Sequence, residues 1–458
     1  MSKKKNIEYL IIGAGPTGIC AATYLVKAGK QVTLVGNVIG GSCSSNGTCA
    51  SQTLHKISRL YEGYRRINDV YIANNQENPA LDFKKIKKTV DQNLNKVKKV
   101  FQDILDNDDI TLIEGVASFT GKNSIKIKMN DETEEEYTFT KCLVATGSLI
   151  QKSNVYSKKL PGDLSTFVTM ENIPESVTIV GAGLLGVEIS SFYQRLGCKV
   201  TLVDKNERIL SKIDPFIAKK FEDTIKKRGI NIVTNFKMVK VEKVGQKYFA
   251  LSEEESIESE EIYLCTGRVS AISELMLENA GVTLKNGDFV EYNNHLQTSN
   301  ENIYIAGDAS TVFMNVNWSY YTADIAVRNM IGQQTALIQS HLPVYVNSEP
   351  AIALIGITEE EAKAEGFECG IIKYTYNEVY GYTLISGQST VIKLVYDKEN
   401  KTFLGVQAIG YGSKDIVEIF AMIINLNVNV ENISYMSYIN PLFSDFFNEV
   451  FEKILWEK

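Results

Sequence analysis

Two stretches of the chain share one pattern of hydrophobic and polar positions. In each, an apolar run ends in a Gly-x-Gly-x-x-Gly turn, an amphipathic segment follows, and a second apolar run opens with Val-Thr-Leu-Val. The stretches are YLIIGAGPTGICAATYLVKAGKQVTLVG at 9–36 and VTIVGAGLLGVEISSFYQRLGCKVTLVD at 177–204. The pattern is typical of a buried strand, a tight turn, a helix and a parallel strand. We therefore predict two βαβ units of the same kind.

The glycines of both turns match the roles needed to hold a pyrophosphate. The first permits the tight turn, the second lets the backbone approach the phosphates, and the third lets the helix pack against the sheet. The helix N-terminus then faces the phosphates. We predict two Rossmann-like dinucleotide-binding domains. Their cofactor-binding residues are Gly13, Gly15, Pro16, Thr17 and Gly18 in the first unit, and Gly181, Gly183, Leu184, Leu185 and Gly186 in the second.

The two units differ where their second strands end. The second unit has Asp204 there, and an acid at this place accepts hydrogen bonds from ribose hydroxyls and repels an added phosphate. It therefore favours NAD(H) over NADP(H), a preference that the nearby Lys205 and Arg208 could soften. The first unit has Gly36, which cannot bond to a ribose, although Asn37 could substitute.

Length, charge and composition disfavour several classes of protein. The chain has 458 residues, long enough for about three domains, and a formal charge of −7, which disfavours a nucleic-acid partner. No segment has the ~18 consecutive apolar residues of a membrane span, and the start MSKKKNIEYLIIGAG reads as a strand instead of a signal peptide. Seven cysteines in a chain of this length do not form a secreted disulfide framework. We expect a cytoplasmic protein with no membrane partner and no metal site.

Further segments complete a resemblance to a known family. A cysteine pair in GGSCSSNGTCASQTLHK (40–56) follows the first unit, and NIYIAGDAS (302–310) occurs later in the chain. Together with the two dinucleotide units, these segments resemble the FAD-dependent pyridine nucleotide–disulfide oxidoreductases. Dihydrolipoamide dehydrogenase, glutathione reductase and mercuric reductase belong to that family. The resemblance spans almost the whole chain.

The resemblance implies a domain layout and an assembly. It places an FAD-binding domain at 1–148 and 269–335, with an NAD(P)-binding domain at 149–268 inserted between its two parts. A C-terminal α+β dimerisation domain would occupy 340–458, beginning with a linker at 340–350, so that the enzyme would be a homodimer. The expected fold class is α/β, with two Rossmann-like domains and this third domain.

The resemblance also implies cofactor contacts outside the two glycine turns. The cysteine segment, GVASF (115–119), LVATGS (143–148) and IYIAGDA (303–309) would surround FAD, with Asp308 at its ribityl chain. YLCTGRVS (263–270) would be the return from the NAD(P)-binding domain, and Glu188 would have the position of the family glutamate that pairs with a lysine. The residues carried over are Gly41, Ser42, Ala117, Thr146, Gly147, Gly307 and Asp308 for FAD, and Glu188, Asp204 and Gly267 for NAD(H).

The cysteine pair departs from the family pattern. In the family, four residues separate two cysteines that form a redox-active disulfide, but here five separate Cys43 from Cys49. Aligned without a gap, Thr48 falls where the flavin-facing cysteine belongs, and Gln52 replaces the usual lysine. One inserted residue would instead bring Cys49 into register and misplace the residues after it. The sequence alone leaves both alignments open.

The proton shuttle departs as well. The family carries a His-Pro-Thr-x-x-Glu motif near its C-terminus, and the matching NPLFSD has Asn440 and Asp445 in the positions of its histidine and glutamate. Asparagine cannot act as an acid or base near neutral pH. His55 follows the cysteine turn and could approach it, but we expect a histidine on a helix surface. Glu188 would face Gln52 and could form a hydrogen bond with it, but not a salt bridge.

Three functions remain open at this point. The first is an oxidoreductase that passes electrons from NAD(P)H through FAD to Cys43, with or without Cys49, and on to a thiol or disulfide substrate. The second keeps the flavin but uses Cys43 alone, or reduces oxygen, a quinone or a carbon substrate directly. The third is a nucleotide-binding protein with little turnover, supported by Gly36 and Asn440.

Overall fold

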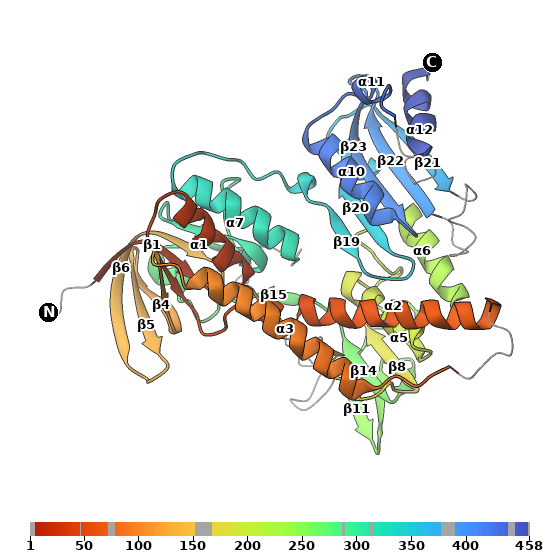
Figure 1. The fold of residues 1–458 in the computed structure, drawn as a ribbon, viewed down its shortest axis with the longest axis horizontal. Helices are drawn as coiled ribbons and strands as arrows, with labels where there is room; N and C mark the ends of the chain where they lie inside the picture. Colours follow the sequence, from red (N-terminus) through yellow and green to blue (C-terminus); the bar gives the residue numbers. More distant parts are fainter. Residues whose placement is uncertain are drawn as a thin grey trace.

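The structure is a computed structural model of the chain. Along the sequence, an N-terminal, a central and a C-terminal unit are each built around their own sheet (Figure 1). This arrangement confirms the predicted α/β class with its third, C-terminal unit. The structure describes residues 5–45, 47–71, 78–151, 167–285, 289–310, 315–376, 390–437 and 445–456.

The N-terminal unit contains the first glycine turn. Its sheet has the order β3 (Ile110–Ile113), β2 (Val32–Val35), β1 (Lys5–Ile12), β6 (Glu134–Val144), β5 (Ser124–Met129) and β4 (Gly115–Gly121), with β18 (Ile303–Ile305) also paired to β6. β18 returns to this sheet after the whole central unit has been formed. Two neighbouring helices, α1 (Pro16–Lys27) and α7 (Val316–Met330), cover one face (Figure 1). The unit is therefore assembled from two separate parts of the chain.

The central unit contains the second glycine turn. Its parallel sheet has the order β10 (Asn231–Val233), β9 (Lys199–Val203), β8 (Ser176–Val180) and β14 (Glu261–Leu264). The helices α5 (Leu184–Arg195) and α6 (Pro215–Lys227) pack against it. β8, α5 and β9 repeat the arrangement of β1, α1 and β2, as the repeated sequence predicts. An antiparallel ribbon of β11 (Lys240–Val244), β12 (Lys247–Leu251) and β13 (Ser256–Ser259) extends from this unit.

The C-terminal unit is an antiparallel sheet covered by helices. The strand order is β19 (Val344–Val346), β20 (Ile352–Gly356), β23 (Thr402–Ile409), β22 (Thr390–Asp397) and β21 (Cys369–Tyr376). Its apolar face packs against α10 (Ser413–Asn425) and α12 (Asp445–Trp456). No helix in the described ranges is long and apolar enough to cross a membrane.

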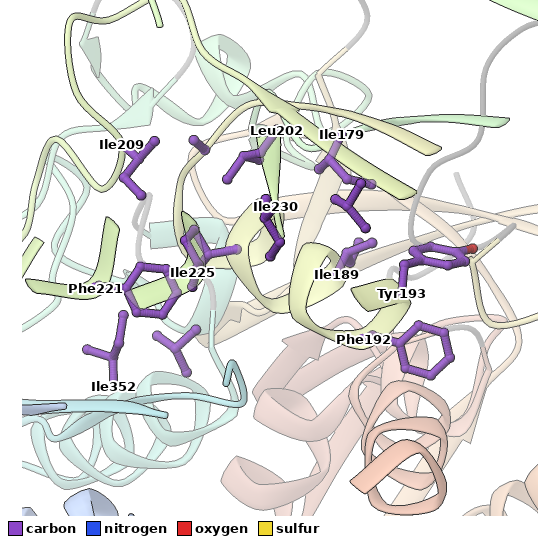
Figure 2. Close-up of a cluster of buried hydrophobic side chains, with 14 of the residues drawn as sticks. Ile179, Ile189, Phe192, Tyr193, Leu202, Ile209, Phe221, Ile225, Ile230 and Ile352 are labelled. Atoms are coloured by element: carbon purple, nitrogen blue, oxygen red, sulfur yellow. The ribbon is translucent and has the colours of Figure 1, made fainter. Parts of the chain in front are cut away.

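Two connections join the N-terminal and central units. The antiparallel strands β7 (Ser148–Ile150) and β15 (Arg268–Ser270) pair at the crossing. The long helix α2 (Thr48–Tyr71) begins at the cysteine segment and runs along α5, so that its residues share the central core (Figure 1). Figure 2 shows part of that core, in which Ile189 of α5 lies between Ile179 of β8 and Phe192 of α5 in this view. A single helix, α2, thus connects the cysteine segment to the second dinucleotide unit.

Candidate active site

A cavity of about 350 Å³ lies at the carboxyl ends of β1 and β2. Ligands of open parallel sheets bind at this edge, because the glycine turn and the helix N-terminus meet there. The cavity brings together segments that are far apart in the sequence. The predicted FAD residues that line it are Gly13, Gly15, Pro16, Thr17, Gly41, Ser42, Ala117, Thr146, Gly147 and Asp308.

Two further predicted residues support the cavity without lining it. A Cβ atom on Gly18 would lie 1.8 Å from the Gly13 carbonyl oxygen, and one on Gly307 would lie 2.1 Å from Thr17 Oγ1. Both glycines therefore permit backbone packing that a side chain would block. Gly15 caps α1 with no side-chain hydrogen bond to the helix N-terminus. The free N–H groups there can bind phosphate, so these residues fit a dinucleotide such as FAD.

Gly36 has a physical role that the sequence does not reveal. A Cβ atom at this position would lie 2.7 Å from the Ala14 backbone nitrogen. The end of β2 therefore passes too close to the glycine turn for any side chain. In the central unit, the matching Asp204 instead accepts a hydrogen bond from the Ala182 backbone N–H through Oδ2 at 2.6 Å. The missing acid of the first unit is a packing requirement, which removes it as an argument against a first nucleotide.

Asp308 belongs to a polar group that sequence reasoning identifies only in part. Its Oδ2 accepts a hydrogen bond from Ser148 Oγ at 2.8 Å, and Ser148 Oγ in turn accepts one from Arg268 Nε at 2.8 Å. Burial raises the pKa of Asp308, while the bond from Ser148 lowers it. Ser148 and Arg268 start the strands β7 and β15, so the crossing between the two units places a cation at the cavity wall. Both lie within segments that resemble the family, but no pattern singles them out.

Cys43 and Cys49 lie on adjacent elements at the cavity. Cys43 is buried in the short helix η1 (Gly41–Ser44), and Cys49 is the second residue of α2. Cys43 and Thr48 line the cavity, whereas Cys49 packs beside the apolar core of the N-terminal unit. Thr48 therefore has the cavity-facing place that the ungapped alignment gives it. Since one helical residue corresponds to a rotation of ~100°, Cys49 faces a different direction.

The two thiols nevertheless interact with each other. The hydrogen bond to Cys49, together with burial, raises the pKa of the Cys43 thiol. The same bond lowers the pKa of Cys49 to about 7, because the Cys43 thiol donates to the Cys49 thiolate. The values belong to the pair as a coupled system. Of the two thiols, Cys49, the less buried sulfur, is therefore the one that ionises first.

The second glycine turn repeats the geometry of the first. A Cβ atom on Gly186 would lie 1.8 Å from the Gly181 carbonyl oxygen, whereas the space around Gly183 is open. Gly183 caps α5 with no side-chain bond, so the N–H groups at Leu184 and Leu185 are left for a ligand. Gly267 precedes β15 with a φ of 130°, a conformation that favours glycine.

The carboxylate of Asp204 is held firmly at the end of β9. Besides the bond from Ala182, its Oδ1 accepts hydrogen bonds from the backbone and side-chain nitrogens of Asn206, each at 2.8 Å. Arg208 does not approach it, because its guanidinium donates to the carbonyl oxygens of Leu210, Ser211 and Ile213. These bonds hold the Arg208 guanidinium at the segment 210–213 that follows it.

The predictions for His55 and Gln52 are wrong. His55 is fully buried between α2 and α5, where α2 crosses the central core. Its Nε2 lies 3.2 Å from Glu188 Oε1, and its Nδ1 lies 2.9 Å from Arg195 Nη2. Gln52 instead accepts a hydrogen bond from Asn347 through Oε1 at 2.8 Å. The reason is helical spacing: His55, three residues after Gln52, faces α5 and takes the place beside Glu188.

Because His55 is buried, the stability of the folded protein depends on pH. Burial lowers the pKa of His55 below its ordinary 6.5, and Glu188 offsets this only partly. The unfolded chain therefore binds a proton that the folded protein resists, so stability falls as the pH drops below about 6.5. We expect wild type to lose up to about 1.4 kcal/mol per pH unit there, and His55→Gln to lack this component. Urea unfolding at pH 7.5, 6.5 and 5.5 measures it, and a stability difference between the two proteins that does not change with pH would contradict it.

The structure describes neither of the two predicted site residues near the C-terminus completely. Asn440 falls outside the described residues. Asp445 is the first residue of α12, and only its backbone is described. Their assignment to the catalytic positions of the family's histidine and glutamate therefore stays a prediction. Among the residues that the structure describes, no group of histidine, cysteine and carboxylate side chains is arranged to hold a metal ion.

Comparison with family models and curated proteins gives a consistent result. The model of the pyridine nucleotide-disulphide oxidoreductases matches residues 7–323, and the model of their dimerisation domain matches residues 342–451. Dihydrolipoyl dehydrogenase from Staphylococcus aureus is 28% identical over 456 residues, which cover 98% of this chain and 96% of the relative. Mercuric reductase from Lysinibacillus sphaericus is 26% identical, covering 94% of this chain and 79% of its own length.

Solved structures share the fold over the full length. LpdA from Mycobacterium tuberculosis superimposes with a TM-score of 0.89 at 19% identity, covering 98% of this chain and 100% of that chain. The HOCl-induced flavoprotein disulfide reductase RclA from Escherichia coli gives 0.84 at 21% identity, covering 97% and 99%. The glycine turns, the cavity and the first family model, which alone spans more than half of the sequence, agree: the chain belongs to the pyridine nucleotide-disulphide oxidoreductases, a family of flavin-dependent enzymes.

Proposed function

We propose that this enzyme uses NADH to reduce a thiol–disulfide centre formed by Cys43 and Cys49, which then reduces a small-molecule or peptide disulfide. The observation that carries the proposal is the thiol pair itself: Cys43 lines the cavity, and its thiol bonds to that of Cys49. FAD, when bound, accepts a hydride from the nicotinamide and releases two electrons to sulfur. The residues predicted for FAD surround the same cavity, which supports this assignment.

The two thiols would have different roles because their pKa values differ. The thiolate of Cys49, with a pKa of about 7, attacks one sulfur of the substrate disulfide, and the first product thiol leaves with the proton of Cys43. The Cys43 thiolate then attacks the Cys49 sulfur of this mixed disulfide and displaces the second product, which leaves as a thiolate and takes a proton from solvent, so that the Cys43–Cys49 disulfide forms. The substrate gains the two electrons that the cysteine pair loses. This division gives the pair its own proton source at a site whose family histidine is replaced by Asn440.

Asp204 would select NADH over NADPH. We expect Asp204→Ala to reduce kcat/KM with NADH by about tenfold, the effect of losing roughly one net charge-assisted hydrogen bond to the ribose. Its effect on NADPH should be smaller or favourable, because a carboxylate no longer faces the added phosphate. Steady-state kinetics with both dinucleotides measure the ratio. An unchanged ratio would show that Asp204 serves only to hold Ala182 and Asn206.

We also propose that the enzyme is a homodimer that associates through its C-terminal unit. Large apolar side chains there are left exposed: Leu426 is 75% exposed and Tyr435 is 91% exposed, with Met422 and Met436 close to them in sequence. Several large exposed apolar side chains in one unit are typical of an association face. The match to the dimerisation-domain model over 342–451 supports the same assignment.

One observation favours a second function. Thr48, and not Cys49, shares the cavity wall with Cys43. If Cys49 stays turned away, Cys43 acts as a single thiol, or the flavin reduces oxygen, a quinone or a carbon substrate directly. Such an enzyme would retain the cofactor scaffold without a dithiol cycle.

Anaerobic titration with NADH distinguishes these functions. A flavin and a disulfide together take up about four electrons per subunit, whereas a flavin alone takes up about two. Uptake of four electrons supports the proposal. Uptake of two electrons contradicts it and favours the second function. A protein whose flavin NADH does not reduce would instead fit a nucleotide-binding role with little turnover.

A further inference from the structure

A second cavity, of about 280 Å³, lies away from the redox site. It is bounded by α2 and by the carboxyl-terminal ends of α5 and α6, three helices that come together in the central unit (Figure 1). Its charged lining consists of four arginines and two carboxylates, an excess of two positive charges. These residues are Arg65, Arg66, Arg195 and Arg228, with Glu62 and Asp69.

Ion pairs within the cavity account for only part of this charge. Glu62 Oε1 accepts hydrogen bonds from Arg66 at 3.1 Å and from Arg228 at 2.5 Å, so one carboxylate serves two arginines. Asp69 is exposed to solvent. Arg65 has no hydrogen bond or ion pair among the described residues, and its Nη1 lies 3.5 Å from where a Cβ atom on Gly197 would be. The Arg65 guanidinium thus reaches over the glycine that borders the cavity.

Arg195 is a buried charged residue with an N–H group unpartnered by any residue that the structure describes, and this feature indicates a ligand. It is 1% exposed, and burial lowers its pKa only to about 10, so it stays charged at neutral pH. Its Nε donates to the Ser191 carbonyl oxygen and its Nη2 contacts His55, but the buried Nη1 has no partner among the described residues. Arg228 Nε, which lines the same cavity, is also buried and has no partner within the described part of the chain. Buried charged donors without acceptors are costly, and an anion would satisfy both.

We propose that this cavity binds a phosphate group, either as free inorganic phosphate or as part of a small phosphate monoester. Arginine forks bind phosphate through paired N–H donors, and Arg65, Arg195 and Arg228 bring such donors to the cavity lining from α2 and from the ends of α5 and α6. The volume is several times the ~30 Å³ share of one water molecule, so it admits a tetrahedral oxyanion. The site is separate from both glycine turns, because Arg195 ends α5 whereas Gly183 begins it.

One histidine connects the cavity to Glu188, a residue predicted to contact NAD(H). Arg195 Nη2 lies 2.9 Å from His55 Nδ1, and His55 Nε2 lies 3.2 Å from Glu188. Glu188 and Arg195 are seven residues apart on α5 and so share the face that meets α2. A phosphate on Arg195 changes the charge that His55 faces. The His55 ring therefore reports whether the cavity is occupied.

Calorimetric titration of the flavin-loaded enzyme with inorganic phosphate tests the proposal. Saturating NAD⁺ should be present to fill the second glycine turn, and ionic strength should be held constant with chloride. We expect saturable binding to wild type, and Arg65→Ala to weaken it by at least about tenfold, the effect of one charged hydrogen-bonding partner. Arg65→Lys should recover part of the affinity. Glycerol phosphate in parallel distinguishes a site for free phosphate from one that also admits esters.

Two controls locate the binding. Lys87→Ala removes an exposed cation from another helix and should leave phosphate affinity unchanged. The chain has three histidines, so the His55 ring signals can be assigned, and phosphate should shift them while those of His295 and His341 stay fixed. Equal phosphate affinity in wild type and Arg65→Ala, or no saturable binding at all, would overturn the proposal. Neither result would bear on the thiol chemistry at Cys43, which the NADH titration tests separately.

Discussion

Cys43→Ser is expected to abolish disulfide reduction, lowering kcat/KM by at least on the order of 10³-fold. Serine keeps the size of the side chain but cannot form a disulfide or a mixed disulfide. Cys43 lines the cavity and is the hydrogen-bond partner of Cys49, so its loss removes both the sulfur at the cofactor side and the support for the Cys49 thiolate. Reduction of the bound flavin by NADH should persist, because it does not require sulfur. Steady-state disulfide reduction and stopped-flow flavin reduction measure the two steps separately.

Two further variants show whether the effect is specific to the pair. Cys49→Ser should remove the extra electron uptake as completely as Cys43→Ser does. Cys369→Ser, at a partly exposed cysteine in β21 of the C-terminal unit, should leave both steps unchanged. A Cys43→Ser enzyme with full turnover would exclude the thiol cycle. A Cys49→Ser enzyme that retains full turnover while Cys43→Ser does not would favour the single-thiol function.

The dinucleotide units could be predicted because their determinants are local. The strand, turn and helix of each unit are adjacent in sequence, and the Val-Thr-Leu-Val runs become β2 and most of β9 as expected. The glycines have fixed spacing because the turn has one geometry. Phosphate-binding turns built within about thirty consecutive residues can therefore be recognised in a single sequence.

Contacts between distant segments could not be predicted. Gly36 is required by Ala14 of the preceding turn, and the group formed by Ser148, Arg268 and Asp308 joins three segments. His55 is buried, against expectation, because the face of α2 that it occupies is covered by α5, more than a hundred residues later. An isolated polar residue in an amphipathic helix gives no sign that a second domain will cover it.

Short strands could not be predicted either, because they too depend on contacts with other segments. The sequence indicates a linker at 340–350, yet Val344–Val346 form β19 at the edge of the C-terminal sheet. A strand of three residues has too few positions to show alternation. Its formation depends on pairing with β20, which sequence periodicity does not report.

Gly13→Ala is expected to prevent FAD binding and to lower the free energy of unfolding by on the order of 3 kcal/mol. The new Cβ would lie 2.2 Å from the Ala145 carbonyl oxygen and 2.6 Å from its carbon, and both atoms are backbone. Gly13 also has a φ of 122°, which alanine rarely adopts. Relief requires β1 to move away from the segment after β6, and that movement distorts the cavity wall formed by Gly13, Ala145 and Thr146. The flavin-to-protein absorbance ratio and thermal unfolding measure both effects.

Gly63→Ala is the matched control, because it adds the same methyl group where nothing opposes it. Gly63 lies within α2, has no atom within 4 Å of the added Cβ, and does not have a positive φ. Alanine should stabilise the helix by roughly 0.5–1 kcal/mol, since it lowers the conformational entropy lost on folding. The Gly63→Ala enzyme should therefore bind flavin fully and unfold at a slightly higher temperature. If Gly13→Ala behaved like this control, the first glycine turn would not form the wall of a cofactor site, and the proposed electron path would lose the flavin between NADH and the cysteines.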